Sequence, residues 1–180
     1  KKAQLYILQT SIQRGDIKIL AEQFIDDWKK DLAGNFVENA LTQNNDNIQA
    51  LIVSNDGMAG GVIEALSRRN LAGKVLVTGQ DAQRDALQSI AEGRQTMTVY
   101  KPIIPLANRA VEAAIKLVKK EPLETTSFMN DAIGKEIQAI LLEVTAVDRS
   151  NLMDTVIKDG YATFDDVYKN VPEADRPKRP

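Results

Sequence analysis

Apolar side chains recur along this chain with two alternating periods, which predict helices and strands in turn. Spacings of three and four residues predict helices over residues 3–14, 32–41, 58–69, 82–92 and 106–119. Short apolar or alternating runs predict strands over residues 17–20, 50–53, 74–78, 95–99 and 137–147. Strands that alternate with helices at this spacing predict an α/β fold with a parallel sheet and helices on both of its faces.

Polar side chains follow several of these strands, at the edge where open parallel sheets bind their ligands. Asn55 and Asp56 follow the strand over residues 50–53, within the stretch SNDGMAGG. Asp81 follows the next strand, and Lys101 follows the one after that. Trp28, the only tryptophan, comes a few residues after the first predicted strand. We therefore expect these groups to gather at one end of the sheet.

The chemistry of four of these residues suits a sugar. Asn55 can donate and accept hydrogen bonds, Asp81 only accepts and Lys101 only donates, which matches vicinal hydroxyl groups that both donate and accept. The flat ring of Trp28 can lie against the apolar face of a pyranose. The set predicts a carbohydrate site in which no protein group has to react.

Each residue also has a purely structural interpretation. Asp56 precedes a helical run and is a natural N-cap, and Asn55 can be a turn residue. Asp81 can cap the helix that follows it, Lys101 can be a solvated surface lysine, and Trp28 can lie in the core. The structural interpretation is the stronger for each residue alone, and the binding interpretation is the stronger for the set.

Nucleotide and metal chemistry receive little support. The spacing of Gly57, Gly60 and Gly61 is not a phosphate-binding fingerprint, and the last two glycines are expected to let their helix pack closely on the sheet. Asp81 and Asp85 lie one helical turn apart and could form a hydrolase pair, but no third carboxylate accompanies them. We expect neither a cofactor nor a metal.

Composition narrows the classes of function further. The 180 residues include no Cys and no His, which excludes disulfide frameworks, thiolate nucleophiles, Ser-His-Asp triads and the usual zinc sites. A net charge of −2 with scattered basic residues argues against a nucleic-acid partner. No apolar stretch approaches the roughly 20 residues of a membrane helix, and the polar start is unlike a signal peptide. Because position 1 is not Met, we expect a processed chain or a piece of a longer one.

Three segments carry a family resemblance: SNDGMAGG, NLAGKVLVTGQDA and EGRQTMTVYKPI. They resemble the C-terminal portion of the periplasmic sugar-binding proteins of ABC transporters, of the type I, ribose/galactose-like class and most closely the D-xylose-binding branch. Asp81 lies 26 positions after Asn55 and Lys101 lies 20 after Asp81, as in that branch. Residues 15–28 and 154–160 are also similar, so the resemblance covers nearly the whole chain.

The resemblance implies a function and a set of contacts. Asn55, Asp81 and Lys101 would hydrogen-bond the hydroxyls of D-xylose or a close neutral monosaccharide, and Trp28 would stack on its ring. The family folds as two α/β lobes that close like a hinge, works outside the cytoplasm, is not enzymatic and delivers sugar to a membrane permease.

The resemblance also implies an incomplete binding unit. Residues 1–100 would form the C-terminal lobe without its first strand, residues 101–130 a crossing segment and a helix of the N-terminal lobe, residues 131–150 a return strand and hinge, and residues 151–180 a C-terminal tail. The polar, proline-rich composition from Pro172 onward predicts that this tail is loosely held. The missing lobe, in the same or a companion chain, would add an arginine and carboxylates. Without it, the helix over residues 106–119 should expose Leu106, Val111, Ile115 and Val118.

Three other functions remain open. The same fold could sense sugar and signal to a membrane histidine kinase. It could also be the effector domain of a lactose-repressor-type regulator, although no basic helix-turn-helix is visible. A sugar-modifying enzyme is the weakest alternative, because the chain lacks His and a plausible carboxylate pair.

Overall fold

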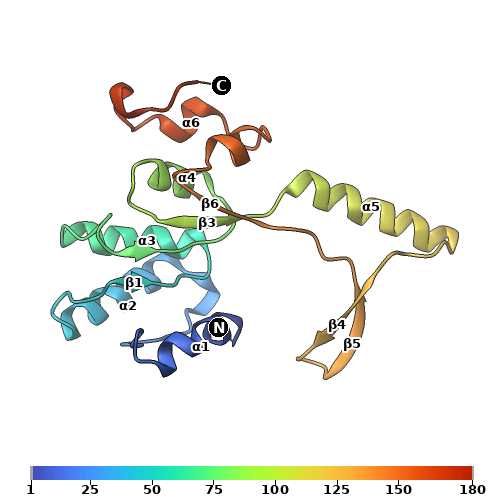
Figure 1. The fold of residues 1–180 in the computed structure, drawn as a ribbon, viewed down its shortest axis with the longest axis horizontal. Helices are drawn as coiled ribbons and strands as arrows, with labels where there is room; N and C mark the ends of the chain where they lie inside the picture. Colours follow the sequence, from blue (N-terminus) through green and yellow to red (C-terminus); the bar gives the residue numbers. More distant parts are fainter. Residues whose placement is uncertain (1, 180) are drawn as a thin grey trace.

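The computed structural model describes residues 2–179, and its first hundred residues alternate helices and short strands (Figure 1). The first elements are α1 (Lys2–Gln13), η1 (Asp26–Trp28), α2 (Lys30–Gln43), β1 (Ala50–Leu51), α3 (Asp56–Arg68), β2 (Leu76–Val77), α4 (Arg84–Ala91) and β3 (Met97–Tyr100). The rest are α5 (Ile103–Lys119), β4 (Thr126–Asn130), β5 (Lys135–Ala139), β6 (Thr145–Asp148), η2 (Met153–Ile157), α6 (Phe164–Tyr168) and η3 (Glu173–Asp175). The five predicted helices are confirmed, with ends that differ by a few residues.

The strands pair in both directions. β1 and β2 are parallel, with Ala50 opposite Leu76, as the alternation predicted. β3 and β6 are antiparallel, and β4 and β5 form an antiparallel hairpin, neither of which the pattern predicted. The amide of Thr96 donates to the carbonyl of Val77 at 2.9 Å, which ties β2 to the chain entering β3.

Two predicted strands are wrong. Residues 17–20 have no regular structure, and their apolar side chains remain 37–44% exposed. A strand exists only where a neighbour accepts its hydrogen bonds, and β1 pairs only with β2 among the described residues. The predicted strand over residues 137–147 is divided between β5 and β6, with an irregular stretch between them.

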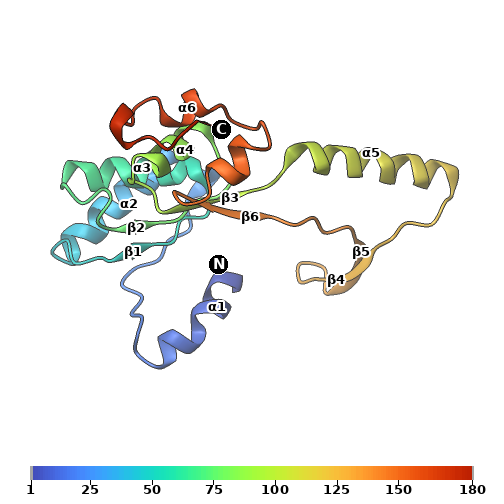
Figure 2. The same ribbon diagram turned by 45° about the horizontal axis from the view of Figure 1, so that its top comes forward.

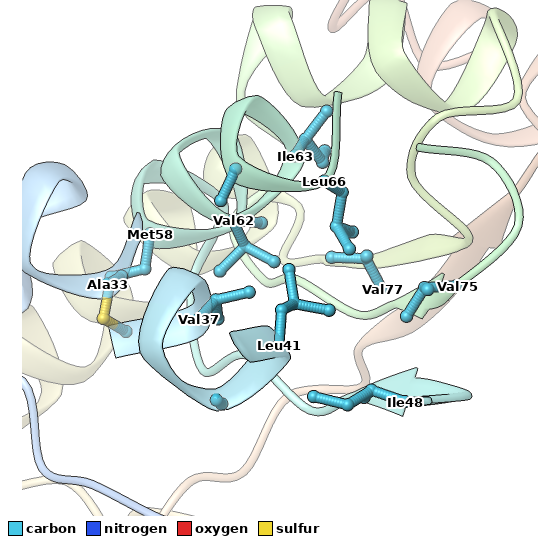
Figure 3. Close-up of a cluster of buried hydrophobic side chains, with 13 residues drawn as sticks. Ala33, Val37, Leu41, Ile48, Met58, Val62, Ile63, Leu66, Val75 and Val77 are labelled. Atoms are coloured by element: carbon cyan, nitrogen blue, oxygen red, sulfur yellow. The ribbon is translucent and has the colours of Figure 1, made fainter. Parts of the chain in front are cut away.

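The first core lies between α2, α3 and the β1–β2 pair (Figure 3). Its buried side chains include Val37 and Leu41 from α2, and Val62 and Leu66 from α3. The close approach is between the two helices, whereas the sequence predicted that the glycines would pack on the sheet. A Cβ atom added to Gly61 would lie 2.1 Å from the carbonyl oxygen of Lys30, the first residue of α2.

The second core joins α4 to the C-terminal elements. Leu87 and Ile90 of α4 are fully buried with Val147, Leu152 and Val156. Side chains of α6 and of the segment before it therefore pack in the same core as those of α4.

The end of the chain is held more closely than the sequence predicted. Arg176 donates to the carbonyl of Val171 at 2.7 Å. Arg179 pairs with Asp165, and its guanidinium lies 5.2 Å from the ring centre of Phe164. These contacts tie the segment after Pro172 to α6.

Helix α5 and the β4–β5 hairpin project away from the body in both overall views (Figures 1 and 2). No residue of α5 is buried, and Leu106, Val111, Ile115 and Val118 are 49–85% exposed, which confirms the predicted stripe. One face of the β1–β2 pair is also open, because Leu76 is 57% exposed there. The sequence predicted helices on both faces of the sheet, and at β1 and β2 this prediction is only partly confirmed. Within residues 2–179, no helix has the length and apolar character needed to cross a membrane.

Candidate functional site

Backbone hydrogen bonds join the turns after β1 and β2 to each other and to strand β3. The amide of Asp56 donates to the carbonyl of Gln80, and the amide of Asp81 donates to the carbonyl of Val99, each at 2.9 Å. The turn after β1 is thus tied to the turn after β2, and the turn after β2 to strand β3. The strand-end rule correctly predicted that these segments meet.

Asp81 and Lys101 form an ion pair at the centre of this region. Lys101 Nζ lies 2.5 Å from Asp81 Oδ1, and the side chains are 44% and 36% exposed, respectively. A strong acceptor and a strong donor therefore lie side by side and open to solvent. The capping interpretation of Asp81 is wrong, because α4 begins at Arg84 with Gln83 in the N-cap position.

The backbone at Asp81 is strained. Asp81 has a φ of 101° and Ala82 a φ of 51°, in the region that non-glycine residues rarely adopt. Such conformations persist only where surrounding contacts hold them, and they are common at ligand sites. The carboxylate therefore reaches Lys101 from a backbone that the rest of the fold must restrain.

Asn55, and not Asp56, is the N-cap of α3. Its Oδ1 accepts from the amide of Met58 at 2.9 Å, so the sequence placed the cap one residue too late. Among the described residues, no group accepts a hydrogen bond from Asn55 Nδ2, and the side chain is only partly buried. One end of this amide thus orders the helix, while the other can still donate to a ligand.

Asp56 is buried, with 1% of its surface exposed. The sequence predicted a helix cap at this position and not a buried, hydrogen-bonded carboxylate. Its Oδ2 accepts from the Gln83 amide at 2.9 Å and from Thr98 Oγ1 at 2.8 Å, and its Oδ1 accepts from Gln95 Nε2 at 2.9 Å. Burial raises the pKa of the Asp56 carboxyl, and the three hydrogen bonds act against this rise. Gly79 leaves room for this carboxylate, because a Cβ atom added there would collide with Asp56 Oδ1.

Trp28 is an exposed residue of η1. Its exposed fraction is 56%, so the core interpretation is wrong. No hydrogen bond or ion pair within residues 2–179 joins Trp28 to Asn55, Asp81 or Lys101. Its stacking role stays a prediction.

The donor set does not resemble a metal centre. The described part of the chain contains no group of three or more His, Cys, Asp or Glu residues that could hold a metal ion. Asp85 uses its Oδ1 to accept from the adjacent Ala86 amide at 3.0 Å. The site is therefore described by hydrogen-bond donors and acceptors alone.

Comparison with known proteins assigns the fold to a known family. A family model for the periplasmic binding protein domain matches residues 2–122, and the chain belongs to this family. The D-xylose-binding periplasmic protein of Haemophilus influenzae is 45% identical over 168 residues, which are 93% of this chain and 50% of the relative. The D-xylose-binding periplasmic protein of Escherichia coli is 42% identical over 161 residues, which are 89% of this chain and 48% of the relative.

A solved structure has the same fold. It is a carbohydrate transporter solute-binding protein from Chloroflexus aurantiacus in complex with D-glucose, with a TM-score of 0.78 and 28% identity. The match covers 89% of this chain and 54% of that one. The chain thus spans about half the length of the curated relatives it matches.

Proposed function

We propose that this chain is the C-terminal part of an extracytoplasmic sugar-binding protein that presents a neutral monosaccharide, first of all D-xylose, to the permease of an ABC transporter. The observation that carries the proposal is the solvent-open pair of Asp81 and Lys101, 2.5 Å apart at the ends of the strands. No bond of the sugar is broken in this function, so the chain acts as a binding protein and not as an enzyme.

The pair is suited to hydroxyl groups. A hydroxyl can donate to Asp81 and accept from Lys101 at the same time, and the charge makes both hydrogen bonds stronger than neutral ones. Asn55 Nδ2 adds a donor from the neighbouring turn. The pair carries no net charge, so it offers a phosphate no counter-charge to offset its lost hydration, which favours a neutral sugar over a phosphorylated one.

The choice of sugar rests on the relatives. Two that are 45% and 42% identical are named for D-xylose, and both names include the periplasm. The structural neighbour at 28% identity holds D-glucose. These names support a neutral monosaccharide as the ligand class, D-xylose as its first member, and a location outside the cytoplasm.

A second lobe would complete the cleft. We propose that it covers the exposed stripe of α5 and closes over the sugar from the side opposite Asp81 and Lys101, in the same chain or as a companion chain. Trp28, exposed on η1, would then stack on the sugar ring.

The 180-residue chain alone is expected to self-associate and to bind D-xylose weakly or not at all. The apolar stripe of α5 is uncovered, which favours self-association. This chain also supplies only one side of the proposed binding cleft, which weakens binding. Adding the part of the Haemophilus influenzae relative that this chain does not match should restore both solubility and binding. Sedimentation velocity with and without xylose measures the first effect, and calorimetry the second. A monomeric 180-residue chain that binds xylose tightly would show that the companion lobe is unnecessary.

A further inference from the structure

We propose that Asp56 is a positioning residue for the sugar site, because its buried carboxylate holds the strained turn from which Asp81 reaches Lys101. The inference rests on the proposed function, since it assumes that Asp81 contacts the ligand. It assigns to Asp56 a task different from that of its neighbour Asn55, which caps α3.

The carboxylate restrains the two amides that directly follow Asp81. Asp56 Oδ2 accepts from the Gln83 amide at 2.9 Å. The same oxygen accepts from Thr98 Oγ1 at 2.8 Å, and Thr98 Oγ1 in turn accepts from the Ala82 amide at 3.2 Å. One amide is therefore held directly and the other through a buried hydroxyl.

These hydrogen bonds act where the backbone is least favourable. Asp81 and Ala82 both have positive φ, and neither is a glycine. A chain released from such a conformation relaxes to a commoner one, which would swing the Asp81 carboxylate away from Lys101. The hydrogen bonds to the Ala82 and Gln83 amides therefore keep the Asp81 carboxylate next to the Lys101 ammonium.

Only a carboxylate fits this position. Three donors converge on its two oxygens, because Gln95 Nε2 reaches Oδ1 at 2.9 Å while the other two reach Oδ2. An amide of the same shape would direct its own N–H groups at one of these donors. Gly79 leaves the space that the carboxylate occupies, since a Cβ there would collide with Asp56 Oδ1.

The first test follows backbone order in this chain with its cleft completed by the companion lobe, as described under the proposed function. In Asp56→Asn, the Ala82 and Gln83 amides should exchange with deuterium at least about tenfold faster, while amides in the α2–α3 core keep their protection. Thr98→Val, which removes the relaying hydroxyl without a large change in volume, should release Ala82 selectively. Asp85→Asn, an exposed carboxylate on α4, is the matched control and should change neither amide. Unchanged exchange at Ala82 and Gln83 in both Asp56→Asn and Thr98→Val would overturn the proposal.

The second test asks whether Asp56 acts through Asp81. In the cleft completed with the companion lobe, Asp56→Asn should weaken xylose binding by about tenfold, but should add little when Asp81 is already asparagine. If the Asp56→Asn variant is unfolded, Thr98→Val takes its place in the same cycle. Equal losses in both backgrounds would overturn the positioning role and leave the proposed function intact. If Asp81→Asn itself does not weaken binding, the proposed site fails, whatever the exchange experiment shows.

Discussion

Replacing Asp81 by asparagine is expected to weaken sugar binding by about 2 to 3 kcal/mol, a factor of about 30 to 150 in the dissociation constant. The change removes the charge that strengthens its hydrogen bonds to sugar hydroxyls and breaks the pairing with Lys101. Thermal stability of the sugar-free protein should change little, because Asp81 caps no helix and asparagine tolerates a positive φ well. Calorimetry of the completed cleft and a thermal melt measure the two effects.

The control for this variant is Asp85→Asn, which makes the same chemical change on an exposed side chain four residues away. It should bind xylose as the unmodified protein does. An Asp81→Asn titration that matches the unmodified protein would remove Asp81 from the site.

Replacing Gly61 by alanine is expected to destabilise the fold by about 3 kcal/mol or more. The new Cβ would lie 2.1 Å from the carbonyl oxygen of Lys30 and 2.9 Å from its carbonyl carbon. Both are backbone atoms and cannot rotate away, so α2 and α3 would have to separate and loosen the core between them. Urea unfolding followed by circular dichroism measures the loss.

Gly57→Ala is the matched control on the same helix. Its nearest neighbour would be a side-chain atom at 3.8 Å, which is an ordinary contact. Alanine is also the better helix former by about 0.8 to 1 kcal/mol, so this variant should be as stable as the unmodified protein or slightly more so. A Gly61→Ala variant of unchanged stability would contradict the close approach of the two helices.

Periodicity was sufficient to predict the helices and the parallel pair of strands. It was not sufficient for residues 17–20, because an alternating run becomes a strand only when another edge is available to it. It also missed the β4–β5 hairpin, whose strands are largely exposed and carry little apolar contrast.

The strand-end rule brought Asp81 and Lys101 together correctly, because it depends only on where strands end. It could not distinguish Asn55 from Asp56 as the cap of α3, since both residue types cap helices about equally well. The burial of Asp56 is decided by Gln95 and Thr98, about 40 residues further along the chain. Contacts at that separation leave no local pattern in the sequence.

Binding of a neutral monosaccharide is tested most directly by a calorimetric comparison of four ligands on this chain with its cleft completed by the companion lobe. D-xylose should bind, D-ribose and D-glucose should serve as neutral competitors of equal or lower affinity, and ribose 5-phosphate should give no binding. The expected discrimination follows from the Asp81–Lys101 pair, which hydrogen-bonds hydroxyl groups but carries no net charge. It therefore supplies no counter-charge for a phosphate that must be partly desolvated on binding. Preference for ribose 5-phosphate over the neutral sugars would contradict the proposal that this site binds a neutral monosaccharide.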